Sequence, residues 1–261
     1  MVVPQARAAV VVGHLNNSGF IENTPSKREE IRGESKVSLS IVIPVLNEAK
    51  SIETCLSALQ PLRDQNLSNQ DVEIILVDGG SEDSTCELAA SFVDHVITSK
   101  PGRGIQMNTG AAIAQGKHLL FLHSDTVLPS GFSPMLISGA QWGFFPVKLS
   151  GLAWPFRVIE RAMNLRSKIT KIATGDQAIF IQSEYFQRVG GFAEIPLMED
   201  VEICGRLKSE AHPLFMPSHV VTSSRRWEQQ GIVRTILRMW RLRLAFFFGA
   251  CPHRLVQQYY P

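Results

Sequence analysis

The sequence predicts an α/β fold, a single domain with a mostly parallel, Rossmann-like sheet flanked by helices. From Ser38 onward, short apolar runs alternate with segments of helical spacing, and the connections between them are short. Two of the apolar runs each end just before a carboxylate, Glu48 in one case and Asp78 in the other. The length of 261 residues, with 44% hydrophobic and 19% charged residues, suits one large α/β domain behind an N-terminal extension.

Residues 1–37 are predicted to be a disordered or targeting extension in front of a domain over 38–261. The extension contains an apolar stretch from Ala8 to Val12 but no clear signal-peptide cleavage pattern. Four glutamates precede Lys36, whereas organelle transit peptides avoid acidic residues. A disordered extension is the favoured interpretation, and organelle targeting stays open.

The first half of the domain, 38–126, is predicted to alternate strand and helix. Apolar residues at Ile52, Cys55 and Leu59 lie on one face of a helix, and the glycines after Asp78 indicate a turn before the next helix. The predicted strands begin at Ile41 and Ile74 and cover 93–98 and 118–122, and the predicted helices cover 52–62, 86–92 and 104–115. Such alternation indicates a parallel sheet with right-handed crossovers.

The second half, 127–261, is less regular. Strands are predicted over 142–149, as an edge strand, and over 177–182 and 215–222, and helices over 157–171, 201–209 and 231 to about 248. The last of these helices is expected to close the chain.

Composition argues against several classes of function. A net charge of +2 gives no reason to expect a nucleic-acid partner. The four cysteines lie far apart without a C-x-x-C pair, so neither a disulfide framework nor a zinc site is indicated. No apolar run approaches the ~18 residues that a membrane-spanning helix needs. We therefore expect a cytoplasmic protein without a transmembrane segment.

The two acidic strand ends predict a ligand pocket. Ligands of open parallel sheets bind at the carboxyl ends of the strands. Carboxylates such as Glu48 and Asp78 accept hydrogen bonds from the hydroxyl and N–H donors of a ribose and a base. The arrangement is typical of a nucleotide pocket.

Further motifs follow in a fixed order, and together with the strand ends they carry a resemblance to a known family. The motifs are Pro44-x-x-Asn47-Glu48, Val77-Asp78-Gly-Gly-Ser81, Gly102-Arg103-Gly104, His123-Ser124-Asp125, Gly175-Asp176-Gln177, Glu199-Asp200 and Ser224-Arg225-Arg226-Trp227. From about Ser38 to Trp227 the chain resembles the family-two glycosyltransferases, inverting enzymes of the GT-A fold that use nucleotide-sugar donors. The Gly-Asp-Gln motif is similar to a small subgroup associated by gene context with arsenosugar biosynthesis.

The resemblance implies a donor site and a divalent metal, Mn²⁺ or Mg²⁺, within 38–126. The implied donor-binding residues are Pro44, Glu48, Asp78, Ser81, Arg103, Ser124 and Asp125. The family's metal-holding Asp-x-Asp is His123-Ser124-Asp125 here, so Asp125 is the expected metal ligand. His123 is either a ring satisfied by the backbone at a strand end or a ligand or ribose contact. Arg103 reaches a phosphate or is an exposed turn arginine.

The resemblance also implies a catalytic base and an acceptor region within 127–261. Asp200, supported by Glu199, matches the family's base, and the alternative is that it only caps the following helix. The implied acceptor-binding residues are Asp176, Gln177, Arg226 and Trp227. For Trp227 the alternative is aromatic packing under the last helix.

Two other functions were weighed against glycosyl transfer. A nucleotidyltransferase would place a glycine-rich loop with a basic residue after the first strand, and Pro44-Val-Leu-Asn-Glu48 has no glycine. A decayed transferase that only binds a nucleotide, a lipid or a protein is favoured by His123 and opposed by the intact Glu199-Asp200 pair.

The predicted closing helix is amphipathic. One side carries apolar residues, and another carries Arg234, Arg238 and Arg241; the apolar set is Val233, Ile236, Leu237, Trp240 and Leu244. Such a helix could lie on an anionic membrane surface, which would suit a lipid-linked acceptor. The favoured interpretation is an ordinary helix packed on the sheet with a solvated basic face.

Overall fold

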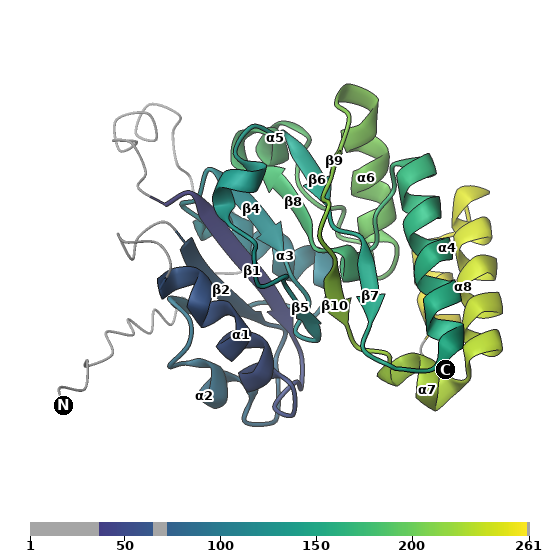
Figure 1. The fold of residues 1–261 in the computed structure, drawn as a ribbon, viewed down its shortest axis with the longest axis horizontal. Helices are drawn as coiled ribbons and strands as arrows, with labels where there is room; N and C mark the ends of the chain where they lie inside the picture. The colour runs from purple at the N-terminus through teal and green to yellow at the C-terminus, as the bar shows by residue number, and fades with distance from the viewer. Residues whose placement is uncertain (1–36, 65–71, 260–261) are drawn as a thin grey trace.

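The computed structural model describes residues 37–64 and 72–259, which form two sheets and the helices around them (Figure 1). The predicted extension therefore lies outside the described residues except for Val37. The larger sheet has seven strands in the order β3-β2-β1-β4-β8-β6-β9. The smaller has three strands in the order β5-β10-β7. The predicted α/β class with a mostly parallel sheet is confirmed.

Four parallel strands form the half of the large sheet nearest the N-terminus. They are β1 (Leu39–Val45), β2 (Val72–Asp78), β3 (His95–Thr98) and β4 (His118–Phe121). Strand β1 pairs with β2 on one side and β4 on the other, and Val45 lies opposite Asp78. All seven residues of β1 and of β2 are buried. Burial on both faces explains why these strands appear in the sequence as continuous apolar runs.

Helices cover both faces of this sheet. Ile41 and Ile43 of β1 share one apolar cluster with Leu56 of α1 (Ile52–Asp64). Val42 lies in another cluster, together with residues of three helices on the opposite face. Those helices are α3 (Arg103–Ile113), α5 (Ser183–Arg188) and α6 (Glu199–Glu210). The short helix α2 (Thr85–Ala89) packs against α1.

The second half departs from the predicted elements at two prolines. The predicted strand over 142–149 divides at Pro146 into β6 (Trp142–Phe144), which pairs with β8 and β9, and β7 (Val147–Leu149), which joins the small sheet. The predicted strand over 215–222 divides around Pro217 into β9 (Leu214–Phe215) and β10 (Val220–Thr222). A proline cannot donate to a strand ladder, so the chain changes sheet at these points. The remaining strands are β8 (Ile179–Gln182), antiparallel to β4, and β5 (Thr126–Val127).

The helices of the second half also differ from the prediction. Helix α4 (Trp154–Thr170) begins three residues early, and α7 (Arg225–Gln230) precedes α8 (Ile232–Phe247). Helix α8 does not close the described chain, because α9 (Pro252–Tyr259) follows it. Two 3₁₀ turns, η2 (Pro134–Ile137) and η3 (Gly175–Gln177), complete the elements.

Helices α4 and α8 stand side by side at the end of the molecule away from β1 and β2 (Figure 1). They share an apolar cluster in which Phe156 and Ile159 of α4 meet Ile232 and Ile236 of α8. The predicted single apolar face of α8 is therefore divided. Ile236 packs inward, while the other apolar residues of the predicted face are exposed: Val233, Leu237, Trp240 and Leu244. Among the described residues, no helix is long and apolar enough to cross a membrane.

Candidate active site

The loops that follow β1 and β2, residues 46–51 and 79–84, are tied to each other by hydrogen bonds; we call them the strand-end loops. The backbone N–H of Asn47 donates to Ser81 Oγ at 2.8 Å, and Glu82 N donates back to Asn47 Oδ1 at 2.9 Å. Glu48 N donates to Oγ1 of Thr85 at 2.8 Å. These crossed bonds hold the two predicted acidic strand ends at one edge of the sheet.

Asp78 is buried and shapes its own loop. Its carboxylate accepts from the backbone N–H groups of Gly80 and Ser81 at 3.0–3.1 Å and from Ser81 Oγ at 2.5 Å. The resemblance implies that Asp78 and Ser81 both contact the donor, and in the structure the two side chains also bond to each other. Any ligand donor would join an already oriented carboxylate.

Gln106 of α3 was not anticipated from the sequence. Its buried side-chain amide donates to the carbonyl oxygens of Val45 and Val77, at 2.8 and 2.9 Å. It therefore fixes the ends of β1 and β2 where they meet the strand-end loops. The signal in the sequence is a polar residue, Gln106, between the apolar Ile105 and Met107 of the predicted helix.

Glu48 and Pro44 occupy different environments. Glu48 is half-buried, and its Oε2 accepts from Ser51 Oγ at 2.6 Å. Pro44 lies inside β1 opposite Val77 and is buried. The strand supports the loop through Pro44, while Glu48 faces the edge where a ligand would bind.

The end of β4 carries Asp125 on a short turn behind the buried Ser124. Burial raises the pKa of Asp125, and the charges of Asp176 and Glu48 raise it further, against the lowering effect of His123. Three carboxylates from separate segments thus act on one another around Asp125. A cation placed here would relieve their mutual repulsion.

His123 pairs with Asp176, a partner that neither sequence interpretation named. Its Nδ1 lies 3.5 Å from Asp176 Oδ1. Its ring lies close against Gly175, where an added Cβ would come within 2.3 Å of the ring Cε1. Although desolvation opposes it, the hydrogen bond and charge of His123, with Arg103 and Arg226, lower the pKa of Asp176. The Gly175-Asp176 pair thus accommodates the His123 ring, because Gly175 has no side chain and Asp176 supplies a carboxylate.

Asp200, the predicted base, is the second residue of α6. Its Oδ2 accepts from the backbone N–H of Gly175 at 2.8 Å, and its Oδ1 accepts from Val201 N at 2.7 Å. Burial, and next the charge of Glu199, raise the pKa of Asp200 to about 6, against the lowering effects of Gly175 and Arg103. The carboxylate therefore bonds within its own helix and also reaches the Gly175 turn.

Glu199 and Arg103 join this cluster from two helices. Glu199 is buried, and its Oε1 lies 3.4 Å from Arg103 Nε at the start of α3. The structure therefore brings together residues from β4, η3, α3 and α6 that lie far apart in the sequence. They are Arg103, His123, Asp176, Glu199 and Asp200.

Non-glycine residues with left-handed backbone flank these groups. Among the described residues only four other than glycine have positive φ, and two of them adjoin site residues: Asn47 at 56° and Met198 at 71°. Such conformations cost of order 1–3 kcal/mol each and persist only where the surroundings impose them. Met198 directly precedes Glu199 and is held in a buried cluster with Leu242.

Two of the predicted acceptor residues lie elsewhere. Gln177 is fully buried, with its Oε1 accepting from Ser167 Oγ at 2.7 Å and its Nε2 donating to Phe145 O at 3.2 Å, which argues against contact with an acceptor. Trp227 is partly buried and packs against the apolar cluster shared by α4 and α8. Arg226 is exposed, lies over the Tyr259 ring at 4.7 Å, and acts on Asp176 by charge.

Among the described residues no group of three or more His, Cys, Asp or Glu side chains could hold a metal ion by itself. A single carboxylate at Asp125, with Asp176 and Glu48 acting on it, fits a cation bound mainly through substrate phosphates. Mg²⁺ in particular is commonly held by one or two carboxylates together with phosphate oxygens.

Comparison with known proteins agrees with this geometry. Residues 40–145 match the family model of glycosyl transferase family 2. This part of the chain is therefore similar to the domains of that family. The matched segment contains both strand-end loops and Asp125, while Asp176 and Asp200 lie beyond it.

Curated relatives match about a third of the chain. A PGL/p-HBAD biosynthesis glycosyltransferase of Mycobacterium tuberculosis is 35% identical over 96 residues, which are 34% of this chain and 36% of the relative. Glycosyltransferase AglE of Haloferax volcanii is 34% identical over 94 residues, 33% of this chain and 30% of the relative. The matches span about a third of each relative's length.

Solved structures extend the likeness to most of the fold. Glucosyl-3-phosphoglycerate synthase from Mycobacterium tuberculosis, in complex with Mn²⁺, UDP and glucosyl-3-phosphoglycerate, superposes with a TM-score of 0.54 at 20% identity, covering 82% of this chain and 80% of that one. Mannosyltransferase PcManGT from Pyrobaculum calidifontis, in complex with GDP-Man and Mn²⁺, gives a TM-score of 0.55 at 19% identity, covering 79% and 60%. These structures confirm the GT-A fold.

Proposed function

We propose that this protein is an inverting glycosyltransferase that moves a sugar from a nucleotide-diphosphate sugar to an acceptor hydroxyl, with Asp200 as the general base. The observation that carries the proposal is the Asp200 carboxylate, held by two backbone donors and with a pKa raised to about 6. A base with this pKa is ionised at neutral pH and still accepts a proton well. Catalytic carboxylates are tuned upward by burial and neighbouring charge in this way.

The strand-end loops supply the nucleoside side of the proposed site. Asp78 and Glu48 present carboxylates at the carboxyl edge of β1 and β2, where ligands bind in open parallel sheets. The family match covers this region, and the relatives named above are glycosyltransferases. Arg103, whose Nε lies 3.4 Å from Glu199 Oε1, would contact the diphosphate.

Asp125 would hold a divalent cation together with the diphosphate oxygens. When bound, such a cation neutralises the charge that develops on the leaving diphosphate. Asp125 itself orients the cation, and Asp176 with Glu48 makes its surroundings negative. The contacts of His123 with Asp176 and Gly175 would hold its ring in place beside such a cation.

The acceptor is expected next to Asp200, between the Gly175 turn and α7, where Asp176 and Arg226 are exposed or half-exposed. Direct displacement with inversion requires the base on the face opposite the leaving group. The finer resemblance to the arsenosugar-associated subgroup stays a prediction, as do the sugar and the base of the donor.

A donor screen tests the proposal. Thermal shift with UDP- and GDP-sugars, with and without Mn²⁺, should show a rise in melting temperature for the true donor that grows with its concentration. Slow donor hydrolysis that needs Mn²⁺ and is lost in Asp125→Ala would support transfer activity. Binding without any turnover, in the presence of hydroxyl acceptors, would instead support the decayed, binding-only alternative.

A further inference from the structure

The outer face of α8 is apolar and unpartnered among the described residues. Val233, Leu237, Trp240, Leu244 and Phe247 recur at intervals of three or four residues, and all are exposed, Trp240 to 75%. Three- and four-residue spacing places them in one stripe along the helix. The inward face is formed by other residues, among them Thr235, Ile236 and Leu242. Helix α8 thus packs on the rest of the protein through one stripe and exposes a second, apolar stripe.

Helix α4 adds a second exposed stripe beside the first. Trp154, Val158, Leu165 and Ile169 fall on one side of α4 and are exposed, Trp154 to 76%. The two helices meet through their inner faces. Isolated surface apolar residues are ordinary, but rows of exposed apolar residues on each of two neighbouring helices indicate an interaction site.

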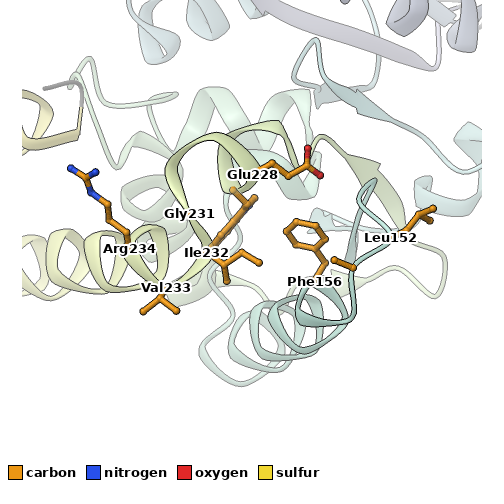
Figure 2. A pocket seen from close by; sticks show the side chains of 9 residues that line it. Leu152, Phe156, Glu228, Gly231, Ile232, Val233 and Arg234 are labelled. Atoms are coloured by element: carbon orange, nitrogen blue, oxygen red, sulfur yellow. The ribbon is translucent and has the colours of Figure 1, made fainter.

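A groove of about 660 Å³ lies between the two helices at their N-terminal ends (Figure 2). Phe156 forms one wall, Ile232 and Val233 form the other, and Leu152, exposed to 97%, stands at the rim. The lining is mostly apolar and suits an acyl or isoprenoid chain; its charged residues are Arg234 and Glu228, and Glu228 accepts a hydrogen bond from Ser224 Oγ at 2.8 Å.

Basic residues border the apolar stripe, and acidic residues are missing from it. Helix α8 contains four arginines and no acidic residue. Arg234 and Arg241 are exposed along the edge of the stripe, and on α4 Arg161 and Lys168 are exposed as well. The single acid of α4, Glu160, is buried and bonded to Leu149 N and Arg157. The surface therefore complements a partner that is apolar inside and negatively charged at its boundary.

We propose that the α4–α8 face docks on the surface of an anionic lipid bilayer. Apolar side chains with tryptophans enter the headgroup boundary, and arginines beside them contact the lipid phosphates. A second copy of the chain is a poorer partner, because a two-fold contact would bring the arginine row of α8 against a helix without acids. This inference concerns a surface, and it does not depend on the proposed transfer reaction.

The docking face is connected to the site through the back of α8. Leu242 of α8 and Leu255 of α9 lie in one buried cluster with Leu197 and Met198, the residues directly before Glu199 and Asp200. A bilayer on the outer stripe would therefore lie one helix diameter, roughly 10 Å, from the loop that carries the proposed base. This geometry would suit an acceptor that is itself held in the membrane.

Vesicle sedimentation with the full chain tests the proposal. The wild-type protein should sediment with vesicles of phosphatidylcholine containing phosphatidylglycerol, and more weakly with phosphatidylcholine alone. The double variant Leu237→Glu with Trp240→Glu should reduce binding at least tenfold. Each substitution removes an apolar side chain that would enter the bilayer and adds a charge that anionic lipids repel. Arg234→Gln and Arg241→Gln should each weaken binding to the anionic vesicles by about fivefold.

Met135→Glu is the matched control, because Met135 is an equally exposed apolar residue, at 82%, on η2. It should bind vesicles like the wild type, and all variants should melt at the wild-type temperature. Wild-type protein that stays in the supernatant, or a double variant that still sediments, would overturn the proposal. So would a wild-type dimer in solution that the double variant converts to monomers without any vesicle binding.

Discussion

The strand-end loops and the loop that carries Asp200 are held in place by different forces. In the strand-end loops, side chains of Ser81, Asn47 and Thr85 accept hydrogen bonds from backbone N–H groups of the segment that follows the neighbouring strand. What we call the Asp200 loop is residues 195–198 together with Glu199 and Asp200, the first two residues of α6; it is held instead by Leu197 and Met198 packing against α8 and α9. Polar substitutions should therefore damage the first region locally, whereas the second should respond to apolar changes that are distant in the sequence.

The largest effect in this comparison should come from Asp200→Asn. The amide keeps the size of the carboxylate but cannot accept the acceptor's proton, so transfer should fall by roughly 10²–10⁴-fold. Donor affinity should persist, because the strand-end loops are untouched. Steady-state transfer and calorimetric donor binding measure the two effects separately. Near-normal transfer in this variant would return Asp200 to the role of a helix cap.

Leu242→Ala should show that the Asp200 loop depends on distant packing. Truncating a fully buried leucine costs about 2–5 kcal/mol of unfolding free energy, which urea titration measures. Because the cavity opens next to Met198, whose left-handed backbone needs support, kcat should also fall at temperatures where the variant is folded.

Leu56→Ala is the matched control for Leu242→Ala. Leu56 is also fully buried, but it packs on the face of the sheet covered by α1. The control should lose similar stability while its folded protein keeps the wild-type kcat. Equal kcat values for the two folded variants would contradict the coupling of α8 to the Asp200 loop.

Asp78→Asn tests the strand-end loops. Its carboxylate accepts three donors in the loop that follows β2, and hydrogen bonds to charged groups contribute about 1.5–3 kcal/mol each. Nucleotide affinity should fall about tenfold or more in calorimetry, with the sheet intact by circular dichroism. Asp94→Asn, at the opposite end of β2 where Asp94 accepts from Ile74 N, should leave affinity unchanged.

The same contrast explains what the sequence could predict. Strands β1 and β2 are buried on both faces, so each appears as a continuous apolar run, and their acidic ends mark the site. The Gly-Gly turn after Asp78 and the helical spacing from Ile52 are equally local signals. Such local signals were sufficient to predict the elements where segments that are close in the sequence are also adjacent in the sheet.

The features that the sequence did not reveal depend on long-range contacts. Nothing local shows that Gln177 is buried, that His123 pairs with Asp176, or that Met198 has a left-handed backbone. The orientation of α8 was also predicted incorrectly, because its arginine row and two apolar stripes allow more than one packing. Helix α9 was missed, although Pro252 at its first position is a common helix start.

The central claim is that Asp200 is the titrating base. A displacement of the pH profile of kcat is the smallest of the expected effects, and it tests this claim most directly. Asp200 must be ionised to accept a proton, so kcat at saturating donor should fall as pH drops through about 6. Glu199→Gln removes the charge that raises this pKa and should move the acid limb to lower pH. Arg103→Gln removes a charge that lowers it and should move the limb to higher pH. Opposite displacements in the two variants are the predicted result, and an acid limb at the same pH in all three proteins would contradict the account.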